Sequence, residues 1–200
     1  FSVGLSPTGA ADPFALRRAC LGVLRTALDR GFALSIREAI EVAYEGVEGL
    51  EVDLPMGEVV SKLLEFFRER LRGLLVEHHP HDVVDACLAS GFDNPVDVRA
   101  RVVALAGLEP SVRTRAGEVF KRATNIAKEA PSGAPRDPAS MGESVHEAEI
   151  ATFRGLEDLD VALQNAHNRR DFPAAFAAIA ALAPLLAEFF THVLVMDEDK

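Results

Sequence analysis

Apolar residues recur three and four positions apart through most of this chain, and this spacing leaves little room for any structure but α-helix. Leu16, Cys20 and Leu24, for example, fall on one side of a helix that turns about 100° per residue. No segment longer than a few residues alternates apolar and polar side chains, as a half-buried strand would. Helices are predicted over residues 13–30, 35–48, 58–77, 82–89, 96–105, 111–130, 143–168 and 172–198. The predicted fold class is therefore all-α, a helical bundle of roughly seven to nine helices.

Residues that favour helix ends mark several of these boundaries. Asp12 before Pro13 predicts a helix start, because aspartate accepts hydrogen bonds from first-turn N–H groups and proline already has a helical φ. Ser35, with a glutamate three residues later, fits the capping-box pattern. Pro184 predicts a kink in the last helix. Residues 131–142 are rich in Pro and Gly and are predicted to be a loop.

The chain is acidic, with a formal net charge of −10, and 48% of its residues are hydrophobic. Non-specific nucleic-acid binding depends on clustered Lys and Arg, so this charge argues against DNA and restricts any RNA contact to a local patch. Cys20 and Cys87 both lie in apolar helical patterns, which favours reduced core thiols over a disulfide.

No targeting or membrane-spanning segment is expected. The apolar run at residues 174–190 contains Pro184 and Glu188, which interrupt it too soon to cross a membrane. Phe1 is not a natural start, and no signal-peptide pattern is present. We therefore expect a cytoplasmic protein whose sequence is cut from a longer polypeptide.

A histidine-rich segment is the main candidate for a metal site or a hydrolase. His78, His79, His81 and Asp82 surround Pro80, but adjacent histidines on a helix point about 100° apart, and ligands of one ion usually lie three or four residues apart. The segment is better explained as an exposed helix terminus. We predict no catalytic and no metal-binding residues, and a helical hydrolase using this segment is the least favoured function.

A basic helix face is the candidate binding site. Between residues 111 and 130, five cations stand against two carboxylates, a local excess of +3. Lys121, Asn125 and Lys128 fall at helical spacing, so two cations and an amide able to read a base edge could line one polar face. The predicted apolar stripe of this helix is Val112, Ala116, Val119, Ala123, Ile126 and Ala130, with Phe120 and Ala127 on its flank.

Several sequence words, in order along the chain, resemble those of the beta subunit of bacterial glycyl-tRNA synthetase. Residues 9–18, with their lead-in from residue 1, resemble the motif that opens the C-terminal helical region of that family, and read GAADPFALRR. Residues 121–126 are similar to its Lys-Arg-x-x-Asn-Ile word, within a fold called the DALR anticodon-binding domain. Residues 81–86 and the closing 189–199 also match.

The resemblance implies that residues 1–55 complete a preceding helical domain and that residues 56–200 form a DALR-like anticodon-binding bundle. It implies binding of glycine-specific tRNA, with Lys121, Arg122, Asn125 and Lys128 as contacts and with Arg17 and Arg18 as further candidates. It also implies a separate alpha subunit as partner, which uses ATP and Mg for aminoacylation, and no cofactor bound by this chain itself. The alternative is a structural or subunit-contact domain of the same enzyme, favoured by the acidic balance and the Ala-rich segment at residues 172–190.

Overall fold

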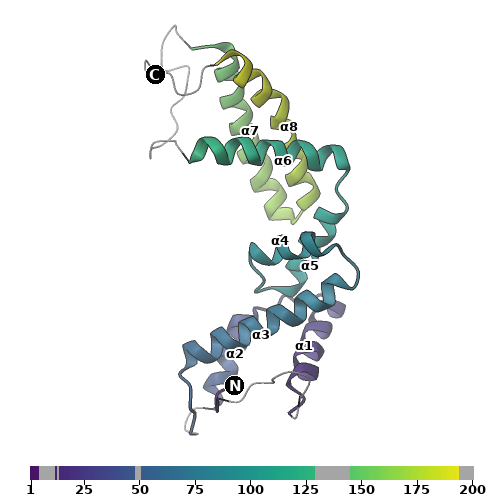
Figure 1. The fold of residues 1–200 in the computed structure, drawn as a ribbon, viewed down its shortest axis with the longest axis vertical. Coiled ribbons are helices and arrows are strands. Elements are labelled where there is room, and N and C mark those ends of the chain that lie inside the picture. Colours follow the sequence, from purple (N-terminus) through teal and green to yellow (C-terminus); the bar gives the residue numbers. More distant parts are fainter. Residues whose placement is uncertain (5–11, 13, 48–50, 129–144, 194–200) are drawn as a thin grey trace. The chain divides into compact units, whose positions relative to one another are not determined.

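The computed structural model describes residues 1–4, 12, 14–47, 51–128 and 145–193. Over these residues the regular structure is entirely helical, in eight helices (Figure 1). They are α1 (Leu16–Arg30), α2 (Ile36–Glu45), α3 (Met56–Val76), α4 (His81–Ala89), α5 (Pro95–Ala106), α6 (Pro110–Ala127), α7 (Glu147–Arg169) and α8 (Phe172–His192). The prediction of an all-α bundle of this size is confirmed. The predicted loop at 131–142 and parts of the opening and closing family words lie outside the described residues.

The chain divides into two compact units, Phe1–Ala106 and Gly107–Lys200, which we call the first and second units. Within the first unit α3 contacts α1, α2 and α4, and α5 contacts α1 and α4. The division therefore does not coincide with the boundary expected at residue 55, because α3, α4 and α5 share their core with the helices before them. The DALR-like character of the chain from residue 56 onward stays a prediction.

The first unit is organised around fully buried aliphatic side chains. Leu24 of α1, Leu71 of α3, Val84 of α4 and Val98 of α5 are all completely shielded from solvent and belong to one cluster. The three-and-four spacing correctly predicted that Cys20 and Leu24 share the buried face of α1. Val23, at the edge of that face, is 44% exposed.

The two cysteines lie in this core as free thiols, as predicted. Burial raises the pKa of Cys20 to about 11, against a smaller opposite effect of the Arg70 charge. Burial likewise raises the pKa of Cys87. Both thiols are thus held protonated at neutral pH, which makes them poor nucleophiles.

Polar caps fix the ends of α1 and α2, partly as predicted. The Asp12 carboxylate accepts from the Arg17 N–H at 3.2 Å, but the helix begins at Leu16 rather than at residue 13, with Ala15 and not Asp12 at the N-cap position. Ser35 accepts from the third residue of α2 at 3.1 Å, as expected. Asp93 adds a cap from far along the chain, since its carboxylate accepts from the Arg37 N–H at 2.8 Å. The spacing of neighbouring residues could not predict a contact between residues so far apart in the sequence.

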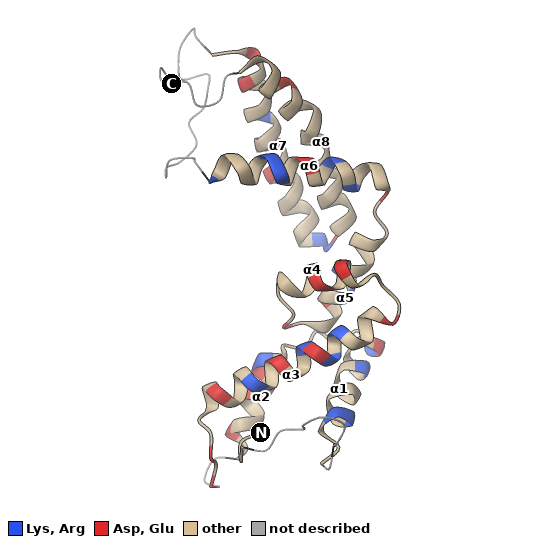
Figure 2. Ribbon diagram, in the orientation of Figure 1, with Lys and Arg blue, Asp and Glu red and all other residues tan. Residues whose placement is uncertain are grey.

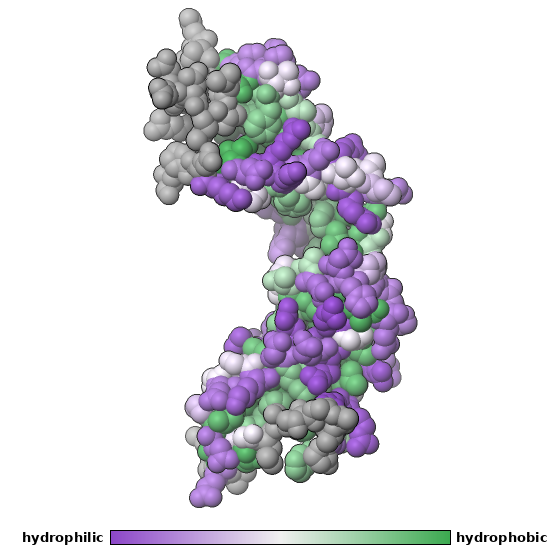
Figure 3. All heavy atoms as spheres, in the orientation of Figure 1, coloured by the Kyte–Doolittle hydropathy of each residue, from purple (hydrophilic) through white to green (hydrophobic). Residues whose placement is uncertain are grey.

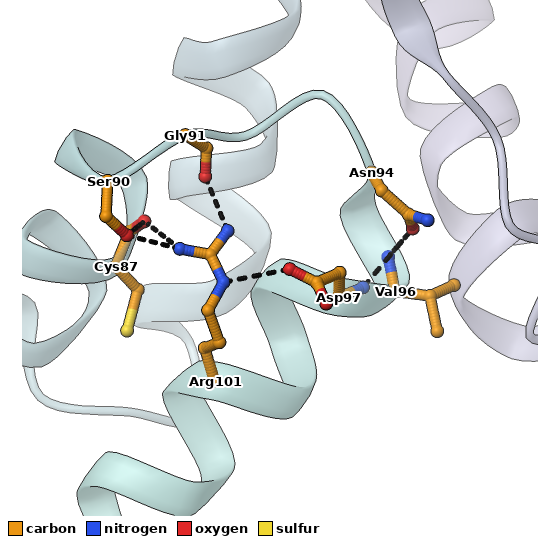
Figure 4. Close-up of polar contacts among 7 residues, drawn as sticks. All are labelled: Cys87, Ser90, Gly91, Asn94, Val96, Asp97 and Arg101. Carbon is orange, nitrogen blue, oxygen red and sulfur yellow. Dashed lines mark hydrogen bonds and ion pairs between the residues drawn. The ribbon is translucent and has the colours of Figure 1, made fainter. Parts of the chain in front are cut away.

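Arg101 of α5 binds the end of α4 and the turn after it (Figure 4). Its guanidinium donates to the Cys87 carbonyl at 2.8 Å, to the Gly91 carbonyl at 2.5 Å and to the Ser90 hydroxyl. Asp97, one turn earlier on α5, accepts from Nε at 2.9 Å. The last carbonyls of a helix lack partners within it, so one mostly buried cation satisfies groups that α4 leaves open.

The second unit packs α8 against both α6 and α7. A Cβ added at Gly155 of α7 would lie 2.5 Å from Cδ1 of Leu185 and 3.3 Å from Cδ2 of Leu182, so α7 and α8 approach closely at this glycine. Thr152, one turn before, is buried and its hydroxyl donates to the Leu185 carbonyl at 3.5 Å. A larger residue at position 155 would therefore have to displace the Leu185 side chain.

By length and composition alone α8 could cross a membrane, with a mean hydropathy of 1.8 over its most apolar stretch. This differs from the expectation that Pro184 and Glu188 interrupt the segment too soon; Pro184 lies inside an unbroken helix. The helix is capped by Asp171, whose carboxylate accepts from the Ala174 N–H at 3.1 Å. Within the described part of the chain, the apolar surface of α8 packs against α6 and α7.

Replacing Arg101 with methionine should lower the free energy of unfolding by about 2–4 kcal/mol, because the carbonyls at the end of α4 and the Asp97 carboxylate lose their donor. Urea denaturation followed by circular dichroism measures this loss. The matched control is Arg99→Met on the same helix, expected to change stability by about 0.5 kcal/mol or less. Equal losses in the two variants would contradict the role given to Arg101.

Two glycine-to-alanine substitutions should have opposite signs. Gly117→Ala on α6, where an added Cβ meets nothing within 4 Å, should stabilise the chain by about 0.5–1 kcal/mol through helix propensity. Gly155→Ala should instead destabilise it by about 1 kcal/mol, since overpacking costs about 1–3 kcal/mol. The midpoints of urea denaturation compare the two variants. Stabilisation by both would show that α8 yields at this contact.

Candidate functional site: the basic face of helix α6

Helix α6 begins with Pro110 in its first turn and runs for 18 residues. Proline is well suited there, because the first N–H groups of a helix have no partner within it. Ala116 and Val119 are buried, and α6 contacts α8. These two buried positions determine which side of the helix faces its neighbours and leave the opposite side to solvent.

The exposed side carries a stripe of three polar residues, Lys121, Asn125 and Lys128, which we call the polar stripe. All three side chains are exposed. Their spacing of four and then three residues brings them onto one face, extending about 10 Å along the helix axis. The predicted alignment of two cations around one amide is thus present, and it points away from the buried side.

Arg122 departs from this stripe. Its guanidinium carbon lies 5.5 Å from the ring centroid of Phe190 on α8, in the range of a cation–π contact. One residue along a helix rotates the side chain by about 100°, which explains why Arg122 turns toward α8 while Lys121 does not. Arg122 therefore links α6 to α8 as well as adding positive charge beside the stripe.

Positive and negative side chains of the second unit are concentrated on different helices. Within its bounds α6 has four cations and one carboxylate, whereas α7 has two arginines against five carboxylates, and α8 has a single glutamate. Figure 2 shows the basic residues distributed along α6, and Figure 3 shows hydrophilic surface over the same helix. Over the part of the chain that the structure describes, no carboxylate forms an ion pair with Lys121 or Lys128. Their charges remain available to an anionic partner.

The apolar stripe of α6 is narrower than expected. Ala123 and Ala127 are exposed, and Phe120, placed on the flank of the stripe, is 50% exposed. The helix is covered mainly by one neighbour, α8, so only the residues at the centre of its apolar side are buried. Sequence spacing located this side correctly but could not give the width of the contact.

Arg17 and Arg18, the further candidate contacts, belong to the other compact unit. They lie in the first turn of α1, in the first unit, whereas the polar stripe belongs to the second. Arg18 is exposed, and Arg17 is half-buried with its backbone N–H bound to the Asp12 carboxylate. These two arginines stay predictions as contacts.

The histidine segment has the geometry of a helix end. The backbone N–H groups of His78 and His79 both donate to the Leu75 carbonyl after α3 ends, and His81 is the first residue of α4. Among the residues that the structure describes, no group of three or more His, Cys, Asp or Glu is placed to hold a metal ion.

Comparison with known sequences identifies relatives of this chain. Residues 1–89 match the sequence model described as "Glycyl-tRNA synthetase beta subunit". A glycine–tRNA ligase beta subunit from Geobacter sulfurreducens is 41% identical over 200 residues, covering 99% of this chain. Those of Anaeromyxobacter dehalogenans (strain 2CP-C) and Desulforamulus reducens are 39% and 34% identical, covering 98% and 100% of it.

The matched region is only part of each relative. The chain spans 28% of the length of the Geobacter and Anaeromyxobacter proteins and 29% of the Desulforamulus protein. The identity nevertheless extends over nearly all of the 200 residues, including both compact units. By this similarity, the chain belongs to the family of glycyl-tRNA synthetase beta subunits.

Proposed function

We propose that this chain is a tRNA-binding part of a glycyl-tRNA synthetase beta subunit and that it takes part in anticodon recognition through helix α6. The observation that carries the proposal is the polar stripe of Lys121, Asn125 and Lys128, exposed on one face of α6 in a chain of net charge −10. The names of the relatives support glycine-specific tRNA as the nucleic acid.

The stripe offers two kinds of contact that RNA recognition needs. Lysine ammonium groups bind phosphates and release counterions, which gives affinity without sequence preference. An asparagine amide has both donors and an acceptor, so Asn125 is suited to a base edge between the two lysines. Arg122 adds a further cation toward α8, and Arg17 and Arg18 are proposed as secondary contacts from the first unit.

The remaining parts of the proposal concern the whole enzyme. A separate alpha subunit would carry out aminoacylation with ATP and Mg, and this chain would bind neither. The region from residue 56 onward would include the DALR-type anticodon-binding fold. The enzyme would act in the cytoplasm, where tRNA is charged.

Lys121→Ala and Lys128→Ala, made in the intact ligase, should each weaken binding of glycine-accepting tRNA and reduce the slope of log K against log salt by about 0.7–0.9. Each variant removes one phosphate contact and the counterion that it releases. The matched control is Lys62→Ala on α3, which removes a lysine paired with Glu58 at 2.8 Å. An unchanged affinity and salt slope in the double variant Lys121→Ala/Lys128→Ala would contradict the proposal.

Asn125→Ala should act on specificity instead. Discrimination between the glycine-accepting tRNA and one with a changed anticodon base should fall by about 1–3 kcal/mol, with the salt slope unchanged. Binding constants for the two tRNAs, compared in wild type and variant, measure this. A uniform loss of affinity for both would reassign Asn125 to the phosphate backbone.

A second candidate function is contact with another subunit of the enzyme. The surface of helix α8 favours it. The larger apolar side chains of α8 are buried or partly buried, but Ala174, Ala177 and Ala181 are exposed at helical spacing, so an alanine-lined side of α8 is open to another protein surface. Removing residues 107–200 from the intact ligase separates the two functions. Lost assembly with tRNA affinity retained would favour the contact role, and retained assembly with lost tRNA affinity favours the main proposal.

A further inference from the structure

The aromatic side chain of Phe120 is only partly buried by the packing of α6. It is 50% exposed, although its neighbours Ala116 and Val119 are buried. Burying a phenylalanine is worth about 1.5–3 kcal/mol, so a half-exposed ring leaves much of that gain unrealised. The ring offers a flat apolar surface directly beside Lys121.

The residues one turn before and one turn after Phe120 on the helix surface are small. Gly117, one turn before, has no side chain, and a Cβ added there would meet nothing within 4 Å. Thr124, one turn after, is small and exposed. Side chains on a helix lean toward its N-terminus, so the ring of Phe120 extends toward the turn that contains Gly117. The side of the ring that faces Gly117 is therefore not covered by a side chain at that position.

The charge near this ring is positive. Lys121 follows Phe120 in the sequence and points about 100° further around the helix, and Lys128 lies about two turns further along. Arg113 lies about two turns before Phe120 on the same side, where its guanidinium donates to the Leu108 carbonyl at 3.3 Å. Glu118, the one carboxylate within the bounds of α6, projects about 160° away from Phe120 around the helix, on the side of Asn125. A partner for this surface should therefore combine a flat π-face with negative charge nearby. An unpaired nucleotide has both.

We infer that Phe120 is a stacking platform for an unpaired RNA base, at the edge of the polar stripe. The inference rests on the proposed function and adds to it a residue that contributes through stacking rather than charge. Aromatic side chains hold bases of any identity, because each base has a π-face. Phe120 then supplies affinity for single-stranded RNA, and the lysines hold the adjacent phosphates.

The test compares Phe120→Leu with Phe120→Tyr in the intact ligase. Leucine keeps apolar volume but has no π-face, and should weaken binding of glycine-accepting tRNA by about 5- to 150-fold with an unchanged salt slope. Tyrosine keeps the ring and should bind within about twofold of wild type. Phe32→Leu is the matched control, since Phe32 is 58% exposed and lies in the first unit. A fully paired RNA duplex should bind both Phe120 variants equally.

The outcomes separate this inference from the proposal beneath it. If Phe120→Leu binds tRNA as wild type does while Lys121→Ala lowers the salt slope, stacking is wrong and the RNA-binding face stands. If Phe120→Leu impairs assembly of the ligase but not tRNA affinity, the ring is a protein contact and the inference is wrong. If neither Phe120→Leu nor the lysine variants change binding, both the inference and the proposed function fail.

Discussion

Burial of one side of α6, at Ala116 and Val119, is the constraint on which the candidate site depends. Once α8 covers that side, the rotation of about 100° per residue leaves no freedom in where the other side chains lie. Lys121, Asn125 and Lys128 must face water, and Arg122 must lie toward α8. The site is therefore a consequence of helix packing, and anything that rotates α6 on α8 would disperse it.

The packing of α7 on α8 also supports this arrangement, because α8 contacts both α6 and α7. Gly155 of α7 permits a close approach of α7 and α8, and the Thr152 hydroxyl donates to the Leu185 carbonyl of α8. The three helices also divide the charge among themselves, with cations concentrated on α6 and carboxylates on α7. A strongly acidic chain can in this way present a locally basic face, since interactions between exposed charges weaken over about 10 Å of salt solution.

Most helices could be predicted because their apolar spacing and end residues are local properties. Residues 58–77 and 82–89 were placed within two residues of α3 and α4, and Ser35 caps α2 as expected. The prediction was less accurate where a distant residue supplies the contact. Asp93 caps α2 from 56 positions away, and Arg101 closes the end of α4. The division into compact units likewise depends on distant contacts, because α3, α4 and α5 share the core of the first unit with α1 and α2.

The sequence by itself determined the helical class, the family and the face of α6 that carries Lys121, Asn125 and Lys128, because each depends on residue types at short spacing. Only the tertiary structure decided the surroundings of the candidate side chains. It turned Arg122 toward Phe190, placed Arg17 and Arg18 in the other unit and left Phe120 half-exposed. Exposure depends on how far a neighbouring helix covers a surface, and that extent is set by contacts between residues far apart in the chain.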